Sequence, residues 1–185
     1  MTARAQELYD IDISSDGFVW NVSRLWANQP ESMDHLFELM SEAFKPSELS
    51  FRDRGILVLA TASTRGDSYC SLAWGGKLAR ASDANLSRAV LTGSDEGLNE
   101  QEAAIASWAR KIVRDPNATT PSDIQGLREV GFSDAQIFAI TFFVALRLAF
   151  STVNDALGAH PDAQLAASLP SEVVSAVSFG REPRD

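Results

Sequence analysis

Apolar residues recur at spacings of three and four along most of the chain, which is the spacing of one face of an α-helix. Within residues 30–44, for example, Met33, Leu36, Phe37 and Met40 follow this pattern. Capping residues and helix breakers divide the rest of the chain in the same way. We therefore expect an all-α fold, with helices over about residues 30–44, 50–63, 68–81, 84–91, 100–114, 120–131 and 133–158.

The last of these helices is predicted to be the central and most buried one. It is apolar on nearly every side over residues 137–150, where only Thr141 and Arg147 interrupt the run. This run is shorter than the roughly 20 residues that a membrane-spanning helix needs. No apolar signal segment follows Met1. We expect a soluble protein in the cytoplasm.

The two ends of the chain have less regular patterns than its middle. We divide the chain into an N-terminal arm, a helical domain and a C-terminal tail, at residues 1–29, 30–160 and 161–185. The arm contains Phe18, Trp20 and Trp26, which is too much aromatic surface to leave in water. It should pack on the body of the protein or on a neighbouring subunit. The tail holds the nearest candidate for a β-strand, residues 173–179.

Composition narrows the classes of function. The chain has 185 residues, a length that suits one domain, and 45% of them are hydrophobic. Its net charge of −9 argues against nonspecific binding to nucleic acid and against docking on an anionic membrane. A single cysteine excludes an intrachain disulfide and a four-cysteine zinc site. With two histidines and no phosphate-binding glycine loop, we expect neither a metal nor another cofactor.

Cys70 is the residue with the most distinctive chemistry. It falls in the first turn of a predicted helix, where backbone N–H groups and the helix dipole favour a thiolate. Cysteine is also commonly buried as a small apolar residue, and from the residues alone this structural role is the more common one. Asp67, one turn earlier, is a good N-cap, and its carboxylate would raise the pKa of the thiol.

Three other residues are candidates for a pocket beside Cys70. Tyr69 is its direct neighbour, and Trp74 could either line a pocket or belong to the core. Arg147 interrupts an apolar helix, so it needs a carboxylate or a group of carbonyls as its partner. The alternative is that Arg147 binds an anionic ligand. His35 and His160 are interpreted as structural or solvated residues.

The segment around Cys70 resembles the alkylhydroperoxidase D and carboxymuconolactone decarboxylase family, in its peroxidase-related branch. The redox members carry the motif Cys-x-Tyr-Cys-x-x-x-His and a glutamate on the preceding helix. Here Asp67-Ser68-Tyr69-Cys70 is followed by Trp74, and the glutamate position falls on Gly55. Other stretches that resemble the family are residues 17–22, 30–31, 98–102, 109–111, 115–116, 123–124, 131–134 and 157–158.

The resemblance implies a helical bundle that forms a homo-oligomer, as a dimer, trimer or hexamer. It also implies a peroxidase cycle in which two sulfurs form a disulfide, while histidine and glutamate relay protons. In this sequence only Cys70, at the attacking position, is kept. Asp67 takes the resolving position, Trp74 the histidine position and Gly55 the glutamate position. These departures speak against dithiol chemistry.

Three functional hypotheses follow from this combination. The chain is a family member with a degenerate redox motif that binds a small molecule. Alternatively, it is a one-cysteine, peroxiredoxin-like antioxidant enzyme that uses Cys70 with an external thiol. The third hypothesis is a non-redox, decarboxylase-type enzyme that acts on small organic acids, with Arg147 as the ionisable group of its pocket.

Overall fold

The computed structural model describes residues 1–185 and confirms the all-α prediction. It contains no β-strand, only one isolated bridge between Asp162 and Arg184. Its α-helices are α1 (Ala3–Asp16), α2 (Asn21–Trp26), α3 (Pro30–Phe44), α4 (Phe51–Arg65), α5 (Ser68–Ala81), α6 (Ala84–Leu91), α7 (Glu100–Arg114), α8 (Pro121–Glu129), α9 (Asp134–Ala156), α10 (Ala163–Ala167) and α11 (Ser171–Ala176). Two short 3₁₀-helices, η1 (Lys45–Ser47) and η2 (Pro116–Ala118), follow α3 and α7.

Side-chain caps fix where the central helices begin. Reciprocal capping boxes start α4, α7 and α9, and they are formed by Ser50 with Asp53, Asn99 with Glu102, and Ser133 with Gln136. Gly66 ends α4 with a φ of 82°, a left-handed conformation that favours glycine. The chain therefore turns sharply there, and α5 starts two residues later, at the segment that carries Cys70.

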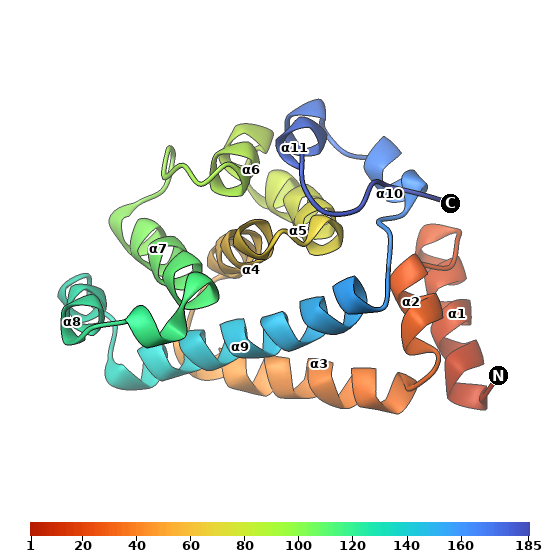
Figure 1. Cartoon of the computed structure of the whole chain (residues 1–185), viewed down its shortest axis with the longest axis horizontal. Helices are drawn as coiled ribbons and strands as arrows, with labels where there is room; N and C mark the ends of the chain where they lie inside the picture. Colours follow the sequence, from red (N-terminus) through yellow and green to blue (C-terminus); the bar gives the residue numbers. More distant parts are fainter.

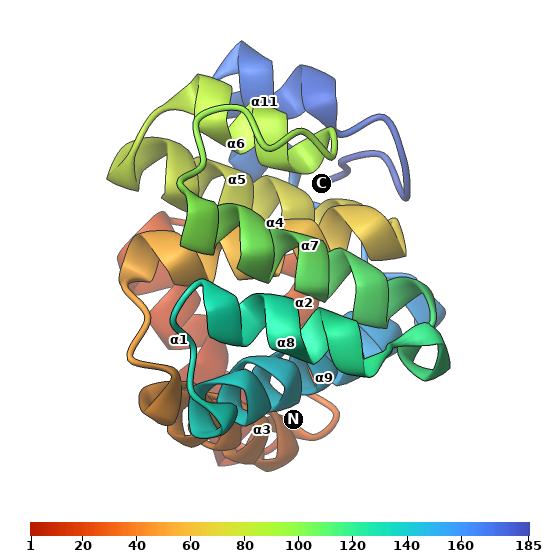
Figure 2. The ribbon, with the colours of Figure 1, turned by 90° about the vertical axis from the view of Figure 1, so that its left-hand side faces the viewer.

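The helices pack as an elongated bundle (Figure 1). The two long helices α3 and α9 lie side by side along one edge, and α4 packs on α5, α7 and α9. Helices α6 and α11 cover α5 on the opposite edge. Seen from the end in Figure 2, α7 and α8 close one end of the bundle, while α1 and α2 lie at the other.

The prediction that residues 133–158 form the most buried helix is wrong. Helix α4 holds the centre, because all of residues 55–62 are buried. Helix α9 lies nearer the edge and keeps one face in solvent, where Phe138 is 71% exposed. The apolar character of α9 on nearly every side therefore reflects an uncovered apolar face as well as a core position.

By length and composition alone, α9 could cross a membrane. Its buried positions, however, include Arg147, Ser151 and Asn154. Ser151 donates a hydrogen bond to Asp67 of another segment, and Asn154 accepts one from the Trp26 indole. These contacts tie α9 to the start of α5 and to the N-terminal arm.

Both ends of the chain belong to the bundle. In the N-terminal arm, the Trp26 ring is buried and its Nε1 donates to the Asn154 side chain at 2.8 Å. Residues 171–176 of the tail form α11 and not a strand, and Val173 is fully buried against α5 and α6. The two ends meet at Asp162, whose carboxylate accepts the backbone N–H of Asn21 at 2.8 Å.

Candidate functional site

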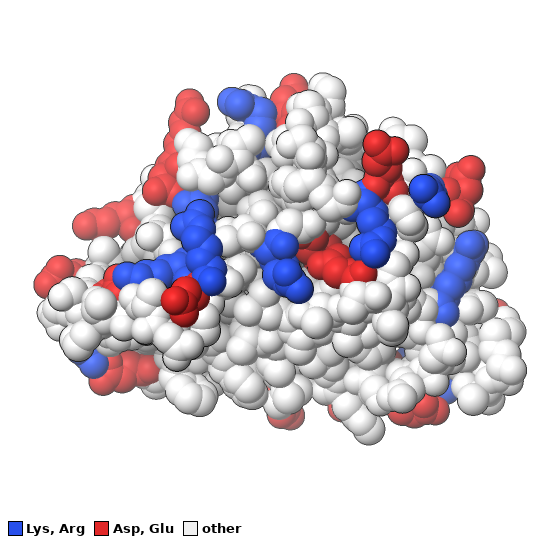
Figure 3. Space-filling model, in the orientation of Figure 1, with Lys and Arg blue, Asp and Glu red and all other residues white.

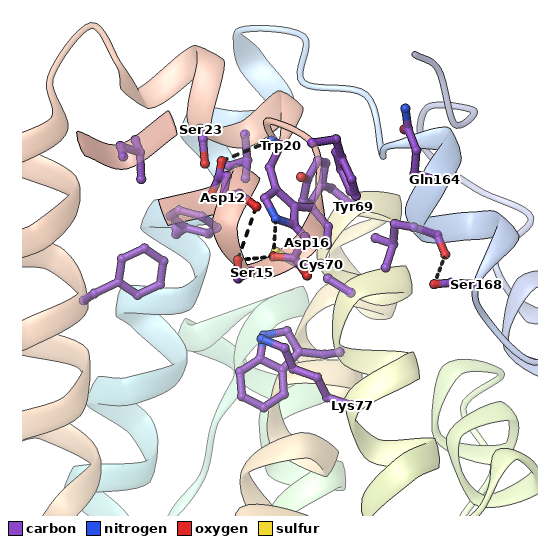
Figure 4. Close-up of a pocket in the computed structure, with 18 of the residues that line it drawn as sticks. Asp12, Ser15, Asp16, Trp20, Ser23, Tyr69, Cys70, Lys77, Gln164 and Ser168 are labelled. Atoms are coloured by element: carbon purple, nitrogen blue, oxygen red, sulfur yellow. Dashed lines mark hydrogen bonds between the residues drawn. The ribbon is translucent and has the colours of Figure 1, made fainter. Parts of the chain in front are cut away.

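A pocket of about 1020 Å³ lies between the N-terminal arm, α5, α9 and the start of the tail (Figure 4). Four residues singled out from the sequence line it: Tyr69, Cys70, Trp74 and Arg147. Asp67 and Gly55, the other two positions of the family motif, do not line it. The pocket therefore brings the attacking cysteine and the histidine position together on one surface of α5.

Cys70 is buried, as predicted, with 2% of its surface exposed. Its backbone N–H donates to Asp67 Oδ1 at 2.9 Å, so Asp67 is the N-cap of α5. The sulfur lies 3.2 Å from Nη2 of Arg147 and 3.9 Å from the hydroxyl of Ser151. The thiol is thus held between α5 and α9 at the wall of the pocket.

Burial raises the pKa of the Cys70 thiol well above its ordinary value, and the negative charge of Asp67 raises it further. Arg147 and the Ser151 hydroxyl act in the opposite direction, but their effect is smaller. The thiol is therefore protonated at neutral pH in the unliganded protein. A protonated thiol is a poor nucleophile.

Asp67 has no exposed surface and is fully occupied by structural contacts. Besides capping α5, it accepts a hydrogen bond from the Ser151 hydroxyl at 2.5 Å. Gly55 lies on α4, where an added Cβ would approach Leu78 Cδ1 at 3.1 Å. A larger side chain at position 55 would therefore meet Leu78. The residue of α4 that lines the pocket is Arg54, which directly precedes Gly55.

Trp74 fulfils both of the roles considered for it. It belongs to the hydrophobic core and also lines the pocket. Three cations surround its ring, with Lys77 Nζ at 4.9 Å, Arg54 Cζ at 5.5 Å and Arg147 Cζ at 5.8 Å from the ring centroid. At the position where the redox members keep a histidine, this chain thus has an aromatic side chain that gathers positive charges.

The expectation that Arg147 pairs with a carboxylate or with carbonyl groups is wrong. The side chain is 3% exposed, and its only hydrogen-bond contacts are to sulfur: Nη2 to Cys70 and Nη1 to Met40 Sδ at 4.0 Å. Its Nε has no partner. Thioether and thiol sulfurs are weak acceptors, so most of the hydrogen-bonding capacity of the guanidinium is unused.

Sequence reasoning missed the other cations of this wall, Arg54, Lys77 and Arg80. Burial lowers the pKa of Arg54, and the charge of Arg147 adds to this effect. Lys77 is an exposed residue, but partial desolvation of its amine, together with the charges of Arg147, Arg54 and Arg80, lowers its pKa. Residues 74, 77 and 80 are spaced by three along α5, so helical spacing could have placed Lys77 and Arg80 on the face of Trp74.

The N-terminal arm contributes two acidic residues to the opposite wall (Figure 4). Asp12 accepts a hydrogen bond from the Trp20 backbone N–H at 3.1 Å, and Asp16 accepts one from the Trp20 indole at 3.0 Å. The Tyr69 hydroxyl donates to buried Asp162 at 2.5 Å. That hydroxyl therefore has a structural partner, while the tyrosine itself lines the pocket.

Neither histidine lies in the pocket. His35 is exposed on α3, and His160 Nδ1 lies 2.8 Å from the backbone carbonyl of Glu182. The arrangement therefore offers no histidine for general acid–base catalysis near Cys70. What it offers is a buried thiol, an aromatic wall and a group of cations.

The sequence matches no protein-family model and no curated protein sequence. Solved structures match it by their fold. An uncharacterized peroxidase-related protein from Silicibacter sp. TM1040 superposes with a TM-score of 0.77 at 21% identity, over 89% of this chain and 87% of the other. An uncharacterized peroxidase-related protein from Ralstonia eutropha JMP134, described as an alkylhydroperoxidase AhpD core, gives 0.72 at 22% identity, over 97% and 90%.

A third similar structure is the debrominase Bmp8, with a TM-score of 0.72 at 16% identity, over 95% of this chain and 92% of the other. A cysteine-to-alanine variant of that debrominase was solved in complex with 2,3,4-tribromopyrrole. At these identities the likeness concerns the fold. This chain therefore has the fold of the alkylhydroperoxidase D core, as its resemblance to that family implied.

Proposed function

We propose that this chain is an alkylhydroperoxidase D-like protein that has lost the dithiol centre and binds a small molecule in the pocket beside Cys70. One observation carries the proposal. Asp67 stands where the resemblance expects the second cysteine, and it is the buried N-cap of α5 and the partner of Ser151. With one cysteine, the chain cannot form the intrachain disulfide that closes the peroxidase cycle.

The size and lining of the pocket support the binding of a small molecule. Ligand pockets commonly have volumes of roughly 300–1,000 Å³ and mostly apolar walls with a few polar groups. This pocket has about 1020 Å³, and 12 of its 23 lining residues are hydrophobic. A debrominase of the same fold holds tribromopyrrole, which supports a compact cyclic ligand here too.

A second candidate is a one-cysteine peroxidase, favoured by the contact of Arg147 with the sulfur at 3.2 Å. In that reaction the Cys70 thiolate attacks a hydroperoxide, giving a sulfenic acid and an alkoxide or hydroxide. Two equivalents of an external thiol then return the sulfenic acid to the thiol, with release of water and a disulfide. The raised pKa of Cys70 disfavours this reaction, because little thiolate is present at neutral pH.

We further propose that the protein is a cytoplasmic homo-oligomer, as a dimer, trimer or hexamer. The exposed apolar residues of α9, Phe138 and Leu157 beyond its end, support an interface there. On the face drawn in Figure 3, the surface over α3 and α9 is largely uncharged, whereas charged side chains gather above it.

The proposal is tested by following peroxide consumption with dithiothreitol as reductant. The wild type and Cys70→Ser are expected to give the same low rate, because neither can cycle through a disulfide. Turnover by the wild type that Cys70→Ser abolishes would contradict the loss of peroxidase activity and would support the one-cysteine reaction, because the chain has no second cysteine. Equal turnover with a monothiol reductant would support that reaction further, since it needs no intrachain disulfide.

A further inference from the structure

The pocket has the opposite charge to the protein that contains it. Four basic side chains and two acidic ones line it, so its lining has a net charge of +2; these residues are Arg54, Lys77, Arg80, Arg147, Asp12 and Asp16. The whole chain carries −9. This pocket therefore carries an excess of positive charge in an acidic molecule, and the field of such a pocket attracts anions.

None of these four cations forms a salt bridge. Five of the other twelve basic residues pair with a carboxylate within 3.2 Å, and they are Arg4, Arg52, Arg110, Lys111 and Arg128. Of the four pocket cations, Lys77 and Arg80 are exposed, whereas Arg147 is buried and Arg54 is half-buried. The contrast is clearest between two buried arginines, each with an unpartnered Nε: the Nη groups of Arg110 donate to Asp95 at 2.7 Å and to the Ser94 carbonyl at 3.3 Å, whereas those of Arg147 contact only sulfur. A buried, unpaired guanidinium is costly, so its persistence indicates a partner that arrives from outside.

Trp74 holds Arg54, Lys77 and Arg147 near one another, and we call these three residues the cationic cluster. The indole face attracts cations without accepting their hydrogen bonds. Arg54 additionally lies over the Phe44 and Phe143 rings, at 5.2 and 5.3 Å from their centroids, and its Nε has no partner. The guanidinium groups of Arg54 and Arg147 therefore both line the pocket with N–H donors that have no partner. An anion bound between them would reduce their mutual repulsion.

We propose that the cationic cluster binds the carboxylate of a compact aromatic acid. This inference rests on the proposed small-molecule function and names its ligand class. Arginine binds a carboxylate through two parallel N–H···O bonds, which suits Arg147, because its Nε has no partner and its Nη groups contact only sulfur. The apolar body of the ligand would lie against Met33, Phe37 and Phe150, which line the same pocket. Such walls disfavour a small, strongly hydrated anion such as phosphate.

The test compares benzoate with its neutral isostere benzamide and with inorganic phosphate, using titration calorimetry on the full-length wild type. Benzoate is expected to bind, and benzamide about tenfold more weakly or worse, because a hydrogen bond to a charged group is worth about one decade of affinity. Arg54→Gln and Lys77→Gln should each weaken benzoate by about tenfold and leave benzamide unchanged. Arg88→Gln, an exposed arginine on α6 outside the pocket, is the matched control and should change nothing.

Three results would overturn the inference. Equal affinities for benzoate and benzamide that neither substitution changes would show that the pocket binds small molecules without selecting anions. That result would overturn this inference but not the proposed function. Phosphate binding as tightly as benzoate would make the site a general anion site and not one for aromatic acids. No binding of benzoate by the folded protein would exclude this ligand class. The peroxide assay judges the lost dithiol centre separately in every case.

Discussion

Nη2 of Arg147 lies 3.2 Å from the sulfur of Cys70, and both side chains are almost completely buried. The contact joins the only thiol of the chain to Arg147, its most buried basic residue. Because Asp67 caps the same turn of α5, Cys70 has a negative charge on one side and a positive charge on the other. The opposing effects on the thiol pKa do not cancel, since burial and Asp67 prevail.

Replacing Arg147 by methionine should stabilise the unliganded protein. A long apolar side chain removes a buried, unpaired charge, which we expect to raise the free energy of unfolding by about 1–3 kcal/mol. Thermal melting without ligand measures the change. Arg110→Met is the matched control, because Arg110 is also buried but pairs with Asp95, so its loss should lower the melting temperature. A destabilised Arg147→Met would show that Arg147 has a structural role.

Cys70 should react slowly with thiol reagents in the native protein. Its burial and raised pKa leave little accessible thiolate at pH 7. Labelling with a chromogenic disulfide reagent should be at least about 100-fold slower in buffer than in denaturant, as expected for a buried, protonated thiol. Equal rates under the two conditions would mean that the site is open and would favour the one-cysteine peroxidase.

Asp67→Cys should form a reducible disulfide with Cys70, because positions i and i+3 at a helix start suit a Cys-x-x-Cys bridge. Loss of the N-cap costs about 1 kcal/mol, so folding is checked first. Ser68→Cys is the matched control, since positions i and i+2 do not face each other on a helix. Counting free thiols before and after reduction measures both variants. A folded Asp67→Cys that stays reduced would contradict the placement of the motif.

Peroxidase activity should not follow from that disulfide alone. The relay would also need Trp74→His, which opens a cavity, and Gly55→Glu, which pushes on Leu78. Each of these changes should cost about 1–4 kcal/mol.

Asp155 should make stability depend on pH between about 4 and 6. Burial, with the charge of Asp67, raises the pKa of this carboxyl from 3.8 to about 6. The folded state therefore holds a proton that the unfolded state releases, and stability falls as the pH rises through this range. Asp155→Asn should remove the dependence and stabilise the protein at pH 7 by no more than about 1 kcal/mol, since the group is partly exposed to solvent. Urea unfolding at pH 4, 5, 6 and 7 measures the effect.

The protein should be oligomeric at micromolar concentration, with the exposed face of α9 in the interface. Phe138→Glu should shift it towards the monomer, because a charge in an apolar contact is costly. Light scattering of both proteins gives their masses. Phe51→Glu, at an exposed position on α4, serves as the control. A 20.1 kDa species for the wild type at all concentrations would contradict the prediction.

Local signals predicted most of the bundle. Helix α5 runs from Ser68 to Ala81, as expected, because Asp67 and Gly66 mark its start in the sequence itself. The first helix of the N-terminal arm, α1, was not predicted because it buries only Ala5, Leu8 and Asp12, so its apolar pattern is weak. The sequence pattern placed α9 at the centre of the bundle, where the structure has α4. An exposed apolar residue and a buried one give the same pattern in a sequence.

The site was only partly predictable, for a different reason. Cys70 and Trp74 share one helix, so their spacing indicates that they lie together. Arg54, Asp12 and Arg147 line the same pocket from three other helices. No local sequence pattern shows which helices pack together, so their proximity could not be predicted. The lack of a carboxylate beside Arg147 was equally hidden, because pairing depends on long-range packing.

Asp162 ties the pocket to both ends of the chain. It accepts hydrogen bonds from the Asn21 backbone and from Tyr69, which immediately precedes Cys70, while the backbone of Arg184 bonds to Pro161 and Ala163. The start of α2, Tyr69 of the pocket wall and the tail are thus held together by one buried carboxylate. A single side chain therefore couples the position of the N-terminal arm to that of the helix that carries Cys70.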